Sequence, residues 1–402
     1  MHQYIAYLGN NPAISTAELS AVLPDFLKQP DIAPGILSFS TKEELDQKFL
    51  NKLGGTILIA RVISGTSVFA LNDVPTVLAT ECAGMKGKLC FALRFVGVGP
   101  NQAKELYRKC KDMLKSKGNS SRYIGNERDA AKPIQLHDEG MIEGKKACEL
   151  VILQTKTSLI LARTIAAQNV KAYTLRDIEK PVRDTTVGLL PPKLAQIMLN
   201  FGAYVSNVKP GKQATVFDPF CGTGVIPLEA MLRGDNVLAS DVSLKAVNGC
   251  EKNLEWGRKI YKIAKKDVTD SVWKQDAIKP FELKEKPTMI VTEGTLGPNL
   301  KDRATVKDAD KFARDLGQLI KEFLQNCAKT LPGTPVVMTL PVWYAQKKQL
   351  WLEKFFEHCT DAGFTPVLPP HVSPTTDERF SLLYRRPDQF VGREIVILKP
   401  KA

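Results

Sequence analysis

Two acids and two glycines have the types and spacing of a nucleoside-binding site. Asp218 opens the run D-P-F-C-G-T-G, in which Gly222 and Gly224 allow a sharp turn and a close approach of the backbone to a ligand. Asp241 follows about 20 residues later, the spacing of an acid that accepts hydrogen bonds from ribose hydroxyls. Because a carboxylate at position 218 repels phosphate, the run favours a cationic ligand with an amino-acid tail over a dinucleotide.

A strand, a turn, a helix and a second strand must hold these residues. Residues 215–217 are β-branched or aromatic, 225–232 have apolar residues at helical spacing, and 236–239 form a second apolar run. This order is the first half of a doubly wound nucleotide-binding sheet. The run from Asp218 to Gly224, followed by a strand-end acid, resembles motif I of the class I S-adenosylmethionine (SAM)-dependent methyltransferases. The alternative is an ordinary strand–turn–helix without a ligand.

Longer runs resemble one branch of those enzymes. R-D-x-x-x-P-x-R-D over residues 176–184, G-L-L-P-P-K-L-A-Q-I-M-L-N after it, L-Y-R-R-P-D-Q at 383–389 and the opening Y-L-G-N-N-P-A-I-S-T-A-E-L are similar to tRNA guanosine-N2-methyltransferases. These archaeal and eukaryotic enzymes act at tRNA position 10 and carry a THUMP domain. The resemblance implies an α/β fold with a C-terminal Rossmann-like methyltransferase domain, preceded by α+β ferredoxin-like and THUMP domains.

We therefore expect four parts in the chain. They are a ferredoxin-like module (1–83), a THUMP-like RNA-binding domain (84–167), a linker over the active site (168–192) and the methyltransferase domain (193–402). In the first part, Ser15 with Glu18 predicts a capping box that opens a helix, and residues 42–53 predict a second helix.

The resemblance also implies how SAM is bound, across the carboxyl ends of the strands. Asp218 would face its amino group, Asp241 its ribose hydroxyls and Asp276 its adenine amino group. The turn would line the methionine portion through five residues: Phe220, Cys221, Gly222, Thr223 and Gly224.

The chain departs from the family after the predicted strand at 288–292. Methyltransferases of exocyclic amines carry an Asp or Asn, two prolines and an aromatic residue here, whereas residues 293–298 read E-G-T-L-G-P. We expect catalysis to centre on Glu293, with Gly294 and Thr295. The Glu293 carboxylate can accept hydrogen bonds from the amine and favour the positive charge that builds during transfer. Three aromatic residues could stack on the base instead of the missing one: Phe220, Trp343 and Tyr344.

The charge distribution indicates a polyanionic partner. The net charge of +13 divides into −3 for residues 1–83, +9 for 84–190 and +7 for 191–402, and a predicted helix at 101–117 carries six basic residues. Few aromatic residues accompany them, which favours the backbone of a structured RNA, such as tRNA, over stacked single strands. We expect phosphate contacts from Arg176, Arg183 and Lys193, with Asp177 and Asp184 orienting the arginines.

Composition limits the remaining possibilities. The 402 residues suggest two or three domains, no apolar run approaches the roughly 20 residues of a membrane span, and no signal peptide is recognisable. Eight scattered cysteines without a C-x-x-C pair, and four histidines without ligand spacing, predict reduced thiols in the cytoplasm and no metal site.

Two alternatives stay open. The chain could bind RNA with altered or lost methyl-transfer activity, or it could methylate another RNA position or DNA adenine. The sequence also leaves open one or two methyl additions, a small activating protein partner, and a monomeric or homodimeric state.

Overall fold

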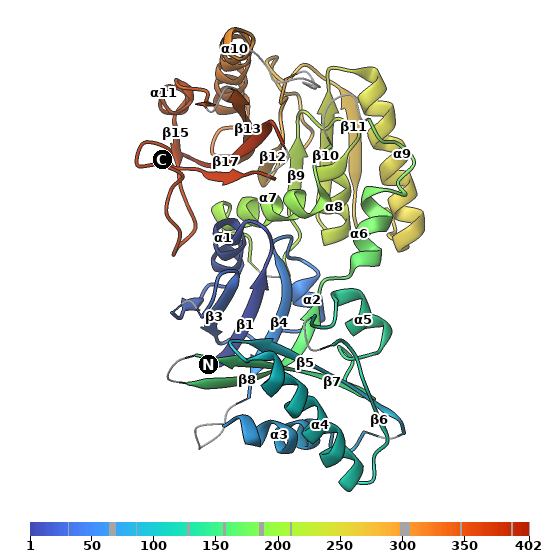
Figure 1. Ribbon diagram of the computed structural model, residues 1–402. Helices are drawn as coiled ribbons and strands as arrows, with labels where there is room; N and C mark the ends of the chain where they lie inside the picture. Colours follow the sequence, from blue (N-terminus) through green and yellow to red (C-terminus); the bar gives the residue numbers. More distant parts are fainter. Residues whose placement is uncertain are drawn as a thin grey trace. The chain divides into compact units, whose positions relative to one another are not determined.

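The computed structural model describes residues 1–30, 32–63, 70–85, 87–126, 129–155, 158–184, 189–209, 211–297, 306–345, 348–386 and 389–401. These residues form two compact units (Figure 1). The first unit contains residues 1–12 and 23–173, and the second contains 13–22 and 174–402. Among the described residues, no helix is long and apolar enough to cross a membrane.

An eight-stranded sheet forms the first unit, with strand order β2-β3-β1-β4-β8-β7-β5-β6. Neighbouring strands are antiparallel, except that β5 pairs in parallel with β6 and β7. Because β4 pairs with β8, the sheet is continuous across the predicted boundary at residue 83. The strands are β1 (His2–Leu8), β2 (Leu27–Lys28), β3 (Ile36–Thr41), β4 (Thr56–Val62), β5 (Leu89–Val96), β6 (Ser121–Tyr123), β7 (Ala147–Gln154) and β8 (Leu159–Ala167).

The predicted basic helix is α4 (Pro100–Ser116), which confirms that prediction. Ala103, Leu106, Cys110 and Leu114 recur at helical spacing and form its buried stripe, and α4 packs beside α3 (Val74–Glu81) (Figure 1). Its basic side chains lie on the exposed face: Lys104, Arg108, Lys109, Lys111 and Lys115. The unit's other helices are α2 (Gln47–Leu50), the short η1 (Leu71–Asp73) and α5 (Pro133–Asp138), and α6 (Val170–Asp177) leads into the second unit.

The second unit is built on a mostly parallel sheet in the order β11-β10-β9-β12-β13-β17-β15. Strands β11 to β13 are parallel, whereas β17 runs antiparallel beside β13. Strand order reverses between β9 and β12, and ligands of open α/β sheets bind outside the carboxyl ends of the strands at such a point. The strands are β9 (Thr215–Asp218), β10 (Asn236–Asp241), β11 (Asp270–Lys274), β12 (Met289–Thr292), β13 (Val336–Ala345), β14 (Lys348–Leu350), β15 (Phe364–Pro366), β16 (Leu382–Tyr384) and β17 (Val391–Pro400).

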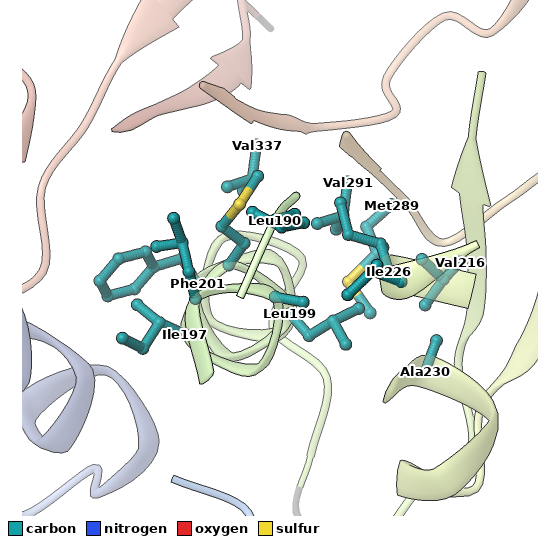
Figure 2. Close-up of a cluster of buried hydrophobic side chains, with 14 of the residues drawn as sticks. Leu190, Ile197, Leu199, Phe201, Val216, Ile226, Ala230, Met289, Val291 and Val337 are labelled. Atoms are coloured by element: carbon teal, nitrogen blue, oxygen red, sulfur yellow. The ribbon is translucent and has the colours of Figure 1, made fainter. Parts of the chain in front are cut away.

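Apolar side chains cover both faces of this sheet. One cluster joins the strands to α1 (Pro12–Val22), α7 (Pro192–Val205), α8 (Val225–Arg233) and α9 (Leu244–Tyr261). Figure 2 shows this cluster around α7, where Phe201 and Leu199 lie among side chains that include Val291 of β12 and Val337 of β13. The other face packs against α10 (Val306–Thr330) and α11 (Phe355–Asp361), with Phe323 and Phe355 fully buried.

Two predicted helices of the first 83 residues differ in the structure. Helix α1 begins at Pro12, so Ser15 and Glu18 lie buried inside it and the predicted capping box is wrong. Proline with its fixed φ suits the first position of a helix, and Glu18 instead accepts a 2.7 Å hydrogen bond from Asn200 Nδ2. The helix expected at 42–53 is the single turn α2, which Asp46 caps by accepting the Phe49 N–H.

Candidate active site

Asp218 ends β9 in a buried position, with 2% of its surface exposed. Its Oδ1 accepts hydrogen bonds from the Thr292 hydroxyl (2.7 Å) and the Phe220 N–H (3.2 Å). Burial raises the pKa of Asp218 to about 7, although both hydrogen bonds lower it, and the nearby acids Asp241 and Glu293 raise it further. A positive group placed beside this carboxylate would favour its ionised form.

The turn after β9 needs both of its glycines, for different reasons. Gly222 and Gly224 have φ values of +51° and +84°, a region that side chains other than glycine rarely adopt. A Cβ at Gly224 would lie 2.6 Å from Cys250 Sγ of α9, so packing excludes a side chain there. A Cβ at Gly222 would meet no atom within 4 Å, so this backbone borders open space that a ligand can use.

Asp241 and Asp276 lie at the same edge of the sheet. Asp241 ends β10, and its Oδ2 accepts the Gly222 N–H (3.0 Å) while Oδ1 accepts a backbone N–H of the next loop (2.8 Å). The Gln275 N–H donates to the Asp241 carbonyl (3.0 Å), which places Asp276 beside it after β11. Each carboxylate oxygen can accept more than one hydrogen bond, so both acids keep capacity for ligand hydroxyl or amino groups.

The remaining turn residues contribute mainly backbone to the site. Phe220 packs its ring edge-on against Phe323 of α10 at 5.2 Å between centroids, and Cys221 is 5% exposed. The Cys221 N–H donates to the Ser240 carbonyl (3.0 Å), and Thr223 offers its carbonyl to α9.

Asn253 of α9 ties this turn to the segment that precedes α7. Its Nδ2 donates to the carbonyls of Val182 (2.9 Å) and Thr223 (2.8 Å), and its Oδ1 accepts the Val182 N–H (2.9 Å). Asn253 lies within a helix and belongs to no recognisable motif, so it was not predicted from the sequence. Residues 185–188 of the predicted linker lie outside the described residues.

Glu293 follows β12, at the same edge as Asp218. Its Oε1 lies 2.6 Å from Arg393 Nε, and its carbonyl accepts the Thr339 hydroxyl of β13 (2.9 Å). Burial raises the pKa of Glu293, while Arg393 opposes that shift through its charge and its hydrogen bond. Arg393 lies 100 residues away along the chain, and no sequence signal pointed to it.

The loop after Glu293 is linked to the cofactor turn through one hydroxyl. The Gly294 N–H points to Thr292 Oγ1 (3.4 Å), and the same hydroxyl donates to Asp218. Gly294 has a φ of +68°, and Thr295 is exposed. Pro298, the last residue of the E-G-T-L-G-P run, lies outside the described residues.

The three aromatic candidates for base stacking differ in exposure and in contacts. Trp343 is 1% exposed inside the second core cluster, so its suggested stacking role is wrong. The Arg385 guanidinium lies 3.7 Å from the centre of the Tyr344 ring and covers one of its faces. Phe220 is half-buried and stays a candidate.

The three residues predicted to contact phosphate have different environments in the structure. The Arg176 side chain is 10% exposed, and its Nε lies 2.8 Å from Glu229 Oε1 of α8, so we do not propose it as a phosphate ligand. Arg183 is exposed, whereas Asp184 contacts Lys245 (3.2 Å). Lys193 lies in the first turn of α7, where burial and the nearby Arg386 lower its pKa.

A comparison with family models matches this region. Residues 182–293, from the segment held by Asn253 to Glu293, match the RMKL-like methyltransferase domain. The chain contains a methyltransferase domain. The match includes Asp218, the glycine turn, Asp241 and Asp276.

Two curated proteins named tRNA (guanine(10)-N2)-dimethyltransferase are similar to parts of the chain. The protein from Methanothermobacter thermautotrophicus is 29% identical over 169 residues, 42% of this chain and 43% of that protein. The protein from Methanocaldococcus jannaschii is 30% identical over 135 residues, 34% of this chain and 36% of that protein. The chain thus spans less than half the length of the curated relatives it matches.

A solved structure is similar over nearly the whole chain. TrmN from Thermus thermophilus superposes with a TM-score of 0.51 and 14% sequence identity, covering 99% of this chain and 100% of that one. At this identity the likeness concerns the fold alone, and it confirms the predicted α/β class with a Rossmann-like methyltransferase domain. The THUMP identity of residues 84–167 stays a prediction.

Proposed function

We propose that the chain is a SAM-dependent RNA methyltransferase that modifies the exocyclic N2 of a guanosine in tRNA. The observation that carries the proposal is the Thr292 hydroxyl, which donates to Asp218 of the cofactor turn and accepts from the loop of Glu293. One side chain therefore connects the position of a cofactor with the position of a substrate acceptor.

The residues of the turn fit SAM. When bound, SAM supplies an electrophilic methyl group on a sulfonium. Asp218 would hold its amino group, because a buried carboxylate with a pKa near 7 gains from a cationic partner. Asp241 would accept from the ribose hydroxyls and Asp276 from the adenine amino group, while Gly222 leaves room beside the turn.

Glu293 supports chemistry on an amine. A guanine N2 amine needs to be held unprotonated with its lone pair in line with the methyl group, which is mostly a matter of position. The Glu293 carboxylate can accept a hydrogen bond from this amine and take up its proton after transfer. Its negative charge also favours the cationic amine that forms.

Three observations support tRNA as the partner. Two relatives are named as enzymes of tRNA guanine 10, and the exposed face of α4 is basic, as expected for binding to an RNA backbone. Arg183 and Lys193 both precede the turn in sequence, and their basic side chains suit phosphate contacts. All eight cysteines are free thiols, which supports a reducing compartment such as the cytoplasm.

The test is methyl transfer to unmodified tRNA transcripts with methyl-labelled SAM, followed by digestion to nucleosides. We expect label in N2-methylguanosine or N2,N2-dimethylguanosine, and its near-complete loss in E293A. Label in another nucleoside would overturn the target, and binding of both SAM and tRNA without transfer would favour an RNA-binding protein. Purified protein alone tests the need for a small activating partner, and its mass in solution separates a monomer from a homodimer.

A further inference from the structure

The Glu293–Arg393 pair differs from an ordinary buried ion pair. Arg393 lies on β17, opposite Pro341 of β13 and Tyr384 of β16, and its side chain is 3% exposed. Its Nε donates to Glu293 Oε1 (2.6 Å), and a terminal nitrogen reaches the Leu189 carbonyl (3.4 Å). One guanidinium therefore holds the acid after β12 and the backbone just before α7.

Glu293 is fixed at two points and keeps one oxygen available. The Thr339 hydroxyl holds its carbonyl at 2.9 Å, and Arg393 holds Oε1. Within the described ranges, no residue donates to Oε2 of Glu293. A carboxylate held in this way presents Oε2 in a defined direction, as a hydrogen-bond acceptor for a substrate amine requires.

The next residue of β17 shows what a purely structural pair looks like. Glu394 points to the opposite face of the sheet, where Arg379 donates to both of its oxygens (2.8 and 2.7 Å). The Ser381 hydroxyl adds a third hydrogen bond to Glu394 (2.6 Å). Both oxygens of Glu394 are thus satisfied within the protein, whereas only one oxygen of Glu293 is.

We propose that Arg393 is a positioning residue of the methyl-transfer reaction, holding Oε1 of Glu293 so that Oε2 receives the substrate amine. This inference rests on the proposed function. Two charged groups face Glu293 among the described residues: Arg393 from β17, and Asp218 from β9, whose like charge acts against the ionised acid. Arg393 therefore also favours the ionised form of Glu293, which taking up the amine proton requires.

The experiment compares R393Q and R393K with R379Q, which breaks the structural pair on the same strand. The rate constant kcat for methyl transfer is measured against pH at saturating SAM and RNA, since bound SAM suppresses the titration of Asp218. We expect R393Q to lower kcat by roughly tenfold to a hundredfold, with the Kd of SAM unchanged. We also expect the acidic limb of its pH–rate profile, where kcat falls as Glu293 becomes protonated, to shift to higher pH. We expect R393K, which keeps the charge, to recover part of the rate, and R379Q to leave the limb in place.

The inference is overturned if R393Q and R379Q lose the same share of activity and thermal stability with the acidic limb unmoved. Failure of the proposed function is seen separately, as SAM binding by the wild type without transfer to any RNA. In that case, the effect of Arg393 on Glu293 is measured by NMR from the 13C-labelled carboxyl signal of Glu293, which is assigned by its absence in E293Q. A titration midpoint in R393Q equal to that of the folded wild type would overturn the inference, and a higher midpoint would support it.

Discussion

Replacing Thr292 by valine tests the hydroxyl that connects the cofactor turn with the substrate loop. Valine has nearly the same shape, and Thr292 is fully buried, so the change removes the 2.7 Å hydrogen bond to Asp218 with little effect on packing. In T292V, the Asp218 carboxylate therefore loses a hydrogen-bond donor that stabilises its charged form.

The size of the effect follows from the energy of such a bond. A hydrogen bond to an ionised group contributes about 1.5–3 kcal/mol, which corresponds to about one to two pKa units. Starting from a pKa of about 7, Asp218 in T292V would be ionised in about one site in five or fewer at pH 7.5, against roughly three quarters in the wild type. If SAM needs the carboxylate, its Kd rises about fourfold or more at that pH, and the difference shrinks toward pH 8.5.

Calorimetric titration of SAM at several pH values measures this effect. The matched control is T334V, because Thr334 is also buried and its hydroxyl has no hydrogen-bond partner among the described residues. We expect the control to bind SAM like the wild type at every pH. Equal binding by T292V and the wild type across the range would refute the role assigned to Asp218.

Three further predictions concern the same turn. The pKa of Asp218 in the folded protein lies above its unfolded value of 3.8, so the stability that protonated Asp218 contributes is lost as the pH rises toward about 7. At pH 8, D218N should therefore raise the free energy of unfolding by at most about 4 kcal/mol. The same change should weaken SAM binding. N253A removes three hydrogen bonds of a buried side chain and should cost about 2–4 kcal/mol, with faster hydrogen exchange at Val182. G222A should cost about 1–2 kcal/mol of stability but abolish SAM binding, whereas G224A should destabilise more, which thermal unfolding and titration together measure.

A specific experimental result would contradict each of these three predictions. Lower stability of D218N than of wild type at pH 8 would contradict the raised pKa. Unchanged exchange at Val182 in N253A would mean that other contacts hold the segment. Normal SAM binding by G222A would show that the ligand does not pass beside this turn.

Local patterns predicted much of the second unit. The strands β9, β10 and β12 followed from continuous runs of β-branched, aromatic and apolar residues, which depend only on neighbours in sequence. In the first unit, the basic helix α4 was predicted in the same local way. Glu293 was placed at the edge of the site by the register of β12 alone, and the structure puts it beside Asp218.

Features that depend on distant residues escaped prediction. Arg393 and Asn253 are ordinary residues until the fold brings them to Glu293 and Val182, 100 and 71 positions away. The acid in contact with Arg176 is Glu229, although Asp177 is its neighbour in sequence. Continuity of the first sheet likewise depends on β4 pairing with β8 across a long separation, which no local pattern records.

The assignment of residues 13–22 to the second unit has a consequence for the order of biosynthesis. Ile14 and Ala17 belong to the core around α7, and the partner of Glu18 is Asn200, 182 positions later. At roughly 5–20 residues per second, a ribosome needs about ten to forty seconds to synthesise that partner, during which this helix lacks its core. A fragment that starts at residue 174 would never acquire it. The nascent chain must therefore keep α1 available while residues 23–173 of the first unit, which precede α7, are synthesised.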